Sequence, residues 1–132
     1  MHFLVAVVIT LCLTAANAAY GQLQIEITKG IDNPTPIAIV PFGWGGAGSS
    51  PEDVARIIDS DLARSGQFAP VSRRDMLSYP TTAGEIFFRD WRAINSDYVL
   101  IGRADPLDGQ RIGLDWELFD TTRQQQIAAG NV

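Results

Sequence analysis

The six residues from 43 to 48 have the spacing most suggestive of chemistry, and they read Gly43-Trp44-Gly45-Gly46-Ala47-Gly48. They satisfy the G-x-G-x-x-G pattern of dinucleotide-binding loops, in which glycines let the backbone approach a pyrophosphate at a helix N-terminus. The pattern follows an apolar stretch typical of a strand and precedes an expected helix. One hypothesis for this chain is therefore a nucleotide-dependent oxidoreductase that uses residues 43–48.

Three features of the same region argue against a cofactor site. Pro51, which suits the first turn of a helix, lies beyond the last glycine, so the glycines fall in a loop. Trp44 places a bulky side chain where the backbone would approach phosphate. About 20 residues further on, where a ribose-binding acid is expected, the chain has Arg73 and Arg74. We therefore expect a glycine-rich surface loop and no bound cofactor.

Several carboxylates are candidate metal ligands or candidate members of an acid pair, namely Asp59, Asp61, Asp105, Asp108 and Asp115. Asp59 and Asp61 are two residues apart on an expected helix, so they face different directions. Asp105 and Asp108 belong to an expected turn, where aspartate bonds to the local backbone. We expect solvated acids, with no metal site and no catalytic residues.

Residues 1–18 have the composition of a secretory signal peptide. An uncharged apolar run extends from Phe3 to Ala16 and closes with the triplet Ala16-Asn17-Ala18. The run is shorter than the roughly 20 residues of a bilayer-spanning helix, and a buried core strand is the alternative interpretation. We expect cleavage before Ala19, which removes the only histidine and the only cysteine, and no membrane insertion of the mature chain.

Residues 19–33 are expected to form a flexible amino-terminal tail that binds a partner. Leu23, Ile25 and Ile27 alternate with polar residues, so an extended tail would carry one apolar stripe. Such a segment could pair with the exposed sheet edge of another protein. The alternative is that the stripe docks back on its own domain.

Residues 34–132 are expected to form one α/β domain. Strands are predicted at residues 36–42, 68–71, 97–104, 111–119 and 126–132, and helices at residues 50–65 and 85–94. Ser50 is the expected N-cap of the first helix, and Gly66 is expected to end it. The strand at residues 36–42 is apolar throughout, so we expect it at the centre of the sheet.

The charge balance of the chain limits its partners. The formal net charge is −5, and no cluster of Lys and Arg is present. Binding to nucleic acids and to anionic membrane surfaces is driven by clustered positive charge, so we expect neither as a partner.

Taken together, several segments resemble the amino-terminal domain of the TolB family. The resemblance rests on residues 22–30, 36–42, 50–53, 61–68 and 97–103, together with Trp91 and the hairpin at Asp108-Gly109. It implies an α/β domain with a mixed five-stranded sheet flanked by helices, similar to the anticodon-binding domains of some aminoacyl-tRNA synthetases. In the family this domain precedes a β-propeller, and we expect the present chain to be a domain cut short at its C-terminal end, without the propeller.

The resemblance also implies a non-enzymatic role in the periplasm of a Gram-negative bacterium. The family belongs to the Tol-Pal system, which supports outer-membrane integrity, outer-membrane constriction in cell division and colicin import. Its amino-terminal segment binds the carboxy-terminal domain of TolA, and Pal binds the propeller, so Pal is expected as a partner only if a propeller is supplied. On this chain the TolA-binding residues correspond to Gln22, Leu23, Gln24, Ile25, Glu26, Ile27, Thr28, Lys29, Gly30, Ile31 and Asp32.

Overall fold

The computed structural model describes residues 33–132. The chain divides into two compact units, Met1–Pro34 and Thr35–Val132, and the fold described is that of the second. Its strands are β1 (Thr35–Ile39), β2 (Gly43–Trp44), β3 (Phe68–Pro70), β4 (Tyr98–Pro106), β5 (Ile112–Asp120) and β6 (Gln125–Asn131). Its helices are α2 (Val54–Ser65) and α3 (Phe88–Ala93), with 3₁₀ turns η1 (Arg73–Asp75) and η2 (Ala83–Glu85).

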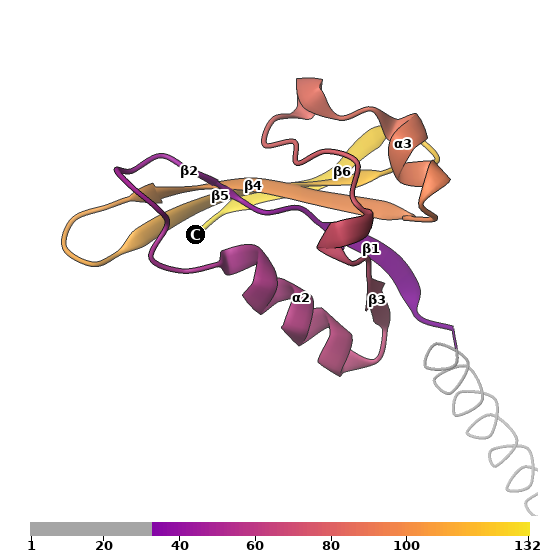
Figure 1. Cartoon of the computed structure of the whole chain (residues 1–132), viewed down its shortest axis with the longest axis horizontal. Coiled ribbons are helices and arrows are strands. Elements are labelled where there is room, and N and C mark those ends of the chain that lie inside the picture. Colours follow the sequence, from indigo (N-terminus) through magenta and orange to yellow (C-terminus); the bar gives the residue numbers. More distant parts are fainter. Residues whose placement is uncertain (1–32) are drawn as a thin grey trace, which may run out of the picture. The chain divides into compact units, whose positions relative to one another are not determined.

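The strands form one mixed sheet in the order β3-β1-β4-β5-β6, and the short strand β2 pairs separately with β4. β1 is parallel to both β3 and β4, whereas β5 is antiparallel to β4 and to β6. Helix α2 lies on one side of the sheet, and α3 with the preceding turn η2 lies on the other (Figure 1). This arrangement confirms the predicted mixed sheet of five strands flanked by helices.

β1 lies inside the sheet with a hydrophobic cluster on each face, as its apolar sequence predicts. Ala38 and Val40 belong to the cluster on the α3 side, which also contains Trp91, Ile101 and Phe119. Alternation along the strand turns Ile37 and Ile39 to the α2 side, where they pack with Ala55 and Leu100. Strand β1 therefore joins the two halves of the core.

Helix α2 begins later than the sequence predicts, and its N-cap is Asp53, not Ser50. The Asp53 carboxylate accepts a hydrogen bond from the Arg56 backbone N–H at 3.1 Å. The Ser50 hydroxyl instead donates to the carbonyl of Glu52 at 2.8 Å, which closes a local turn before the helix. The predicted end is confirmed, because Gly66 adopts the left-handed conformation, with φ of 74°, that glycine tolerates without strain.

The second predicted helix is shorter than expected. Residues 85–87 of the predicted helix lie outside α3, because Glu85 ends turn η2 and both Ile86 and Phe87 have extended backbones. Ile86 is buried, whereas Phe87 is 66 % exposed. Trp91 is 1 % exposed and anchors α3 to the sheet.

The three C-terminal strands form a continuous antiparallel meander. The predicted turn around Asp108-Gly109 joins β4 to β5, and Gly109 has φ of 71°. At the next turn the Asp120 carboxylate accepts from the backbone N–H groups of Thr122 and Arg123, both at 2.9 Å. In residues 33–132 no helix has the length and apolar character needed to cross a membrane.

Candidate functional site

The tail residues predicted to bind a partner lie outside the described part of the chain. This applies to all of residues 22–32. The described residues do include the glycine loop, the helix terminus next to it, the candidate carboxylates and the surface of the sheet.

The glycine loop does not have the geometry of a dinucleotide site. Gly43 and Trp44 form strand β2 beside Arg103 and Ala104 of β4. The Gly45 N–H continues this pairing by donating to the Ala104 carbonyl at 2.9 Å. The last glycine, Gly48, lies well before the start of α2 at Val54. The expected surface loop is therefore shorter than predicted, because its first two residues form β2 and the Gly45 N–H extends the pairing.

The N-terminus of α2 already holds a carboxylate. The Asp53 side chain accepts from Arg73 Nη1 and Nη2, at 2.8 and 2.5 Å. These bonds from Arg73 lower the pKa of the Asp53 carboxyl. Partial burial of the carboxyl raises this pKa, and the hydrogen bond from the Arg56 backbone N–H lowers it further. An anionic side chain in the position where a phosphate would bind makes this terminus a poor nucleotide site.

Arg73 makes a structural contact, although its side chain is 29 % exposed. Its guanidinium ties turn η1 to the start of α2, and its pKa is raised mainly by the bond to Asp53. Its neighbour in sequence, Arg74, makes no ion pair within residues 33–132. Arg73 therefore joins two elements of the fold through its ion pair with Asp53, whereas Arg74 is a surface charge.

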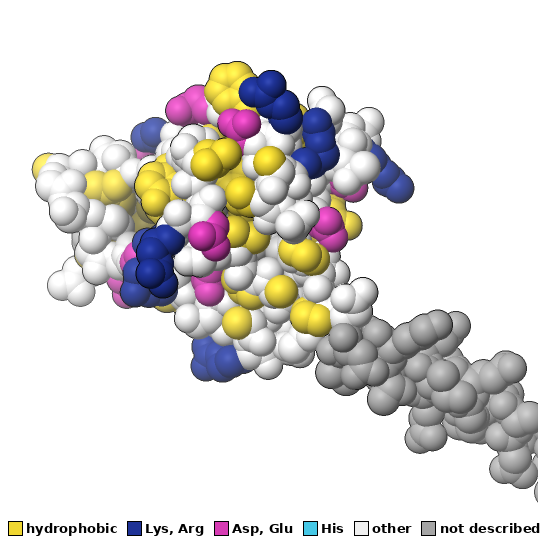
Figure 2. Space-filling model, turned by 45° about the vertical axis from the view of Figure 1, so that its right-hand side comes forward, with side chains coloured by type: hydrophobic (Ala, Val, Ile, Leu, Met, Phe, Trp, Pro, Cys, Tyr) yellow, Lys and Arg dark blue, Asp and Glu magenta, His cyan; other side chains and the backbone are white. Residues whose placement is uncertain are grey.

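The carboxylates that are candidate metal ligands do not form a cluster. Asp61 pairs with Arg64, one turn further along α2, and Asp105 lies 3.7 Å from Arg103. Within residues 33–132 no three side chains of His, Cys, Asp or Glu form a group that could hold a metal ion. On the face shown in Figure 2, arginine side chains stand singly or in small groups with acids between them.

An apolar groove lies between α2 and the exposed part of the sheet, and sequence analysis missed it. Its volume is about 590 Å³. Helix α2 contributes Ile58 and Leu62, the sheet contributes Ile37, Leu100, Trp116 and Leu118, and Ile127 joins them from β6. One apolar helix face is too narrow to cover five strands. The sequence offers a single long apolar helix for this side of the sheet, and this feature predicts that part of the sheet stays uncovered.

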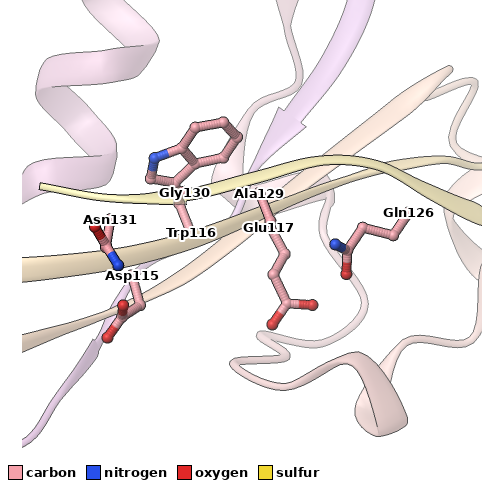
Figure 3. Close-up of a pocket in the computed structure, with 7 residues that line it drawn as sticks. All are labelled: Asp115, Trp116, Glu117, Gln126, Ala129, Gly130 and Asn131. Carbon is pink, nitrogen blue, oxygen red and sulfur yellow. The ribbon is translucent and has the colours of Figure 1, made fainter.

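The opposite face of β5 and β6 is polar. Figure 3 shows the Trp116 ring on one side of these strands and Asp115, Glu117, Gln126 and Asn131 on the other. Strand alternation produces this division, since Asp115 and Glu117 flank Trp116 along β5. The C-terminal half of the sheet therefore presents an apolar surface and a polar surface to solvent.

The fold defines a small α/β module built on a mixed sheet. The sequence model of the TolB amino-terminal domain matches residues 23–127, and the chain therefore belongs to the TolB amino-terminal domain family. This family is non-enzymatic, which agrees with the prediction of a non-catalytic domain and removes support from the oxidoreductase hypothesis.

Curated relatives carry the same assignment. The chain is 43% identical over 124 residues to the Tol-Pal system protein TolB of Pseudomonas syringae pv. tomato, an alignment that covers 94% of this chain and 28% of the relative. It is 45% identical over 116 residues to the protein of the same name from a Marinomonas species, covering 88% of this chain and 27% of the relative. The chain thus spans less than a third of these relatives.

Solved structures agree on the fold. The crystal structure of TolB from Acinetobacter baumannii superposes with a TM-score of 0.59 at 26% identity, covering 76% of this chain and 23% of that one. The C-terminal domain of LpoB from Escherichia coli superposes with a TM-score of 0.59 at 17% identity, covering 82% and 91%. The second likeness concerns the fold alone.

Proposed function

We propose that this chain is a non-enzymatic adaptor domain of the Tol-Pal system that works in the periplasm after cleavage of residues 1–18. In this role it supports outer-membrane integrity, constriction of the outer membrane in cell division and colicin import. Pal becomes a partner only where a propeller is attached. The assignment is supported by relatives that are all named Tol-Pal system protein TolB.

The partner we propose is the carboxy-terminal domain of TolA, bound by residues 22–32. One observation carries this proposal: the family match begins at residue 23 and so includes the alternating segment together with the folded domain. Leu23, Ile25 and Ile27 give the segment one apolar face. Pairing with a sheet edge of the partner would bury that face and satisfy the backbone hydrogen bonds of the segment.

A titration of isotope-labelled protein with the carboxy-terminal domain of TolA tests this proposal, with backbone amide shifts as the measurement. We expect the shift changes to concentrate on residues 22–32. Changes confined to residues 35–132, or none at high partner concentration, would count against the tail as the binding segment.

Two matched variants make the test specific to one face of the tail. Ile25→Ser removes an apolar side chain from the stripe, and Gln24→Ser changes its neighbour on the opposite face. If an added strand buries the stripe, Ile25→Ser weakens TolA binding at least tenfold, because burying such a side chain contributes about 1.5–3 kcal/mol. Gln24→Ser should leave the affinity nearly unchanged, and equal effects of the two variants would contradict strand pairing.

A further inference from the structure

Strand β6 forms one edge of the sheet, and part of its backbone faces away from the other strands. In the part of the chain that the structure describes, β6 pairs with β5 and is last in the strand order. Reciprocal backbone bonds of 2.9 and 3.0 Å join Val132 to Leu114. Hydrogen-bonded and non-hydrogen-bonded pairs alternate in an antiparallel ladder, so the N–H and C=O groups of Ala129 and Asn131 point away from β5.

A β-bulge limits the length of this edge. The register shifts between Leu118 and Phe119 of β5, so Ile127 is an extra residue on β6. A bulge interrupts regular pairing, and the continuous part of the edge is therefore residues 128–132, which we call the β6 edge. It contains no charged residue and no proline, the features that usually prevent strand addition. The opposite edge of the sheet, β3, is three residues long and includes Pro70, which has no N–H to donate.

Two carboxylates beside the β6 edge have no cationic partner among the described residues. Ladder pairing sets Glu117 opposite Ala129 and Asp115 opposite Asn131. Neither acid forms an ion pair within residues 33–132, and the arginine of the neighbouring strand, Arg103, pairs with a different acid. Figure 3 shows both carboxylates on the same side of β5 and β6. This face of the edge therefore carries negative charge that the described residues do not neutralise.

The other face of the β6 edge is apolar. Ala128 and Gly130 lie opposite Leu118 and Trp116. The Trp116 indole leans over Gly130, where an added Cβ would lie 2.8 Å from Cζ2. Because Ala128 and Gly130 have little or no side chain, apolar side chains of an added strand can reach the indole and the groove beyond it.

We propose that the β6 edge accepts an antiparallel strand from a different protein, in which Lys or Arg residues alternate with apolar residues. The basic residues lie opposite Ala129 and Asn131, and the apolar residues lie on the other face, against Trp116. Charge selects this partner, because a basic strand is attracted to the acidic face and to a chain of net charge −5. The site is separate from the amino-terminal tail.

The geometry of the sheet allows the basic side chains to meet the two acids. Neighbouring strands lie about 4.8 Å apart, so the added strand lies about 10 Å from β5, with β6 between them. Ala129 ends at its Cβ, and a long Lys or Arg side chain can extend across it toward the Glu117 carboxylate. The backbone bonds to Ala129 and Asn131 fix the register in which this contact forms.

Titration of the full chain with a short synthetic peptide that alternates Lys and Val tests this proposal, with the fluorescence anisotropy of the labelled peptide as the measurement. We expect saturable binding that weakens as salt is added, because the two acids are partly or fully exposed. A matched peptide that alternates Glu and Val should bind at least roughly tenfold more weakly. Backbone amide shifts caused by the Lys-Val peptide should concentrate on residues 128–132.

Three outcomes would overturn the proposal. The first is no binding of the Lys-Val peptide, or equal binding of the two peptides. The second is amide shifts that leave residues 128–132 unchanged. The third is self-association through this edge in the absence of peptide, because the occupant would then be a second copy of the chain.

Substitutions separate the backbone contacts from the charge contacts. Ala129→Pro removes an outward N–H and no bond to β5, and we expect it to weaken binding of the Lys-Val peptide roughly tenfold with unchanged far-ultraviolet circular dichroism. Asp115→Asn with Glu117→Gln keeps the side-chain shapes and should bring the affinities for the two peptides close together. The matched control is Glu52→Gln with Asp75→Asn, which removes two exposed acids elsewhere. Equal effects of the two double variants would show that binding follows net charge alone, and the proposal would fail.

Discussion

Asp53 combines three roles in one side chain. It caps α2 through the Arg56 N–H, pairs with Arg73 of η1, and places a negative charge at the positive end of the helix dipole. The pKa of this carboxyl is lowered in the folded state, chiefly by Arg73. A lowered folded-state pKa means that folding favours the ionised form of Asp53, so the stability of the fold depends on pH.

We expect the contribution of Asp53 to stability to be complete above the unfolded-state pKa of about 3.9. It is lost as pH falls through the lowered folded-state pKa, because both states are then protonated. Asp53→Asn, which keeps an acceptor for the Arg56 N–H, should therefore unfold with a shallower loss of stability on acidification than the parent. Parallel curves of unfolding free energy against pH for the two proteins would contradict this assignment.

Asp53→Ala removes the cap as well as the charge. We expect it to lower the free energy of unfolding by about 1 kcal/mol, the usual effect of losing an N-cap. The side chain is 43 % exposed, so solvent screens the ion pair, which adds only a fraction to that loss. Denaturant unfolding at neutral pH measures it, and Asp61→Ala, on the exposed side of the same helix, is the control.

Gly102 is required by close packing and not by its backbone angles. A Cβ at this position would lie 2.5 Å from the Phe42 ring and 2.6 Å from the Asp115 carbonyl oxygen. The carbonyl belongs to the β4–β5 ladder and cannot move freely, so Gly102→Ala should lower the free energy of unfolding by about 1–3 kcal/mol. Gly84→Ala is the matched control, since no atom lies within 4 Å of its added Cβ. Equal stabilities of the two variants would contradict this account.

At the scale of elements, Trp91 is the one residue of α3 that is buried. Trp91 is fully buried among Val99, Ile101 and Phe119, yet its indole N–H has no hydrogen-bond partner in the described residues. Burying an unpaired donor costs free energy, which partly offsets the gain from the large ring.

Two substitutions at Trp91 should therefore differ sharply. Trp91→Ala leaves a cavity and should lower the free energy of unfolding by about 3–5 kcal/mol. Trp91→Phe keeps most of the apolar contact and removes the unpaired N–H, so we expect a loss of less than about 1.5 kcal/mol. Chemical denaturation measures both losses, and a Phe variant as unstable as the Ala variant would show that the N–H has a partner in solution.

The strands were predictable because their signals are local. Apolar runs and alternation predict β1, β4, β5 and β6 near their observed positions. The start of α2 was less predictable, because Ser50 and Asp53 both have capping side chains. Asp53 caps the helix because Arg73, which is distant in sequence, holds its carboxylate in place.

The position of the apolar groove could not be predicted, because it depends on the order in which the strands pair, and local sequence patterns do not determine that order. Trp116 and Leu118 show alternation typical of a half-buried strand, which predicts burial on one face. Whether a helix covers that face depends on the strand order, and α2 packs beside β1 and β3. The predicted partner-binding residues 22–32 lie outside the described chain, so they stay a prediction.

At the scale of the whole molecule, the division into two units separates folding from the proposed binding. All residues of the two core clusters in the described chain lie between Ile37 and Phe119, within the unit Thr35–Val132. We propose that residues 22–32 pack on neither cluster, so that their loss would leave the stability of the domain unchanged.

Deletion of residues 22–32 should therefore abolish TolA binding and leave the free energy of unfolding of the domain unchanged. Calorimetric titration with the carboxy-terminal domain of TolA measures the first effect, and denaturant unfolding measures the second. A drop in stability without the tail would instead show that its apolar stripe docks on its own domain. In that case TolA would have to displace the stripe, and TolA affinity would be reduced by the free energy of docking.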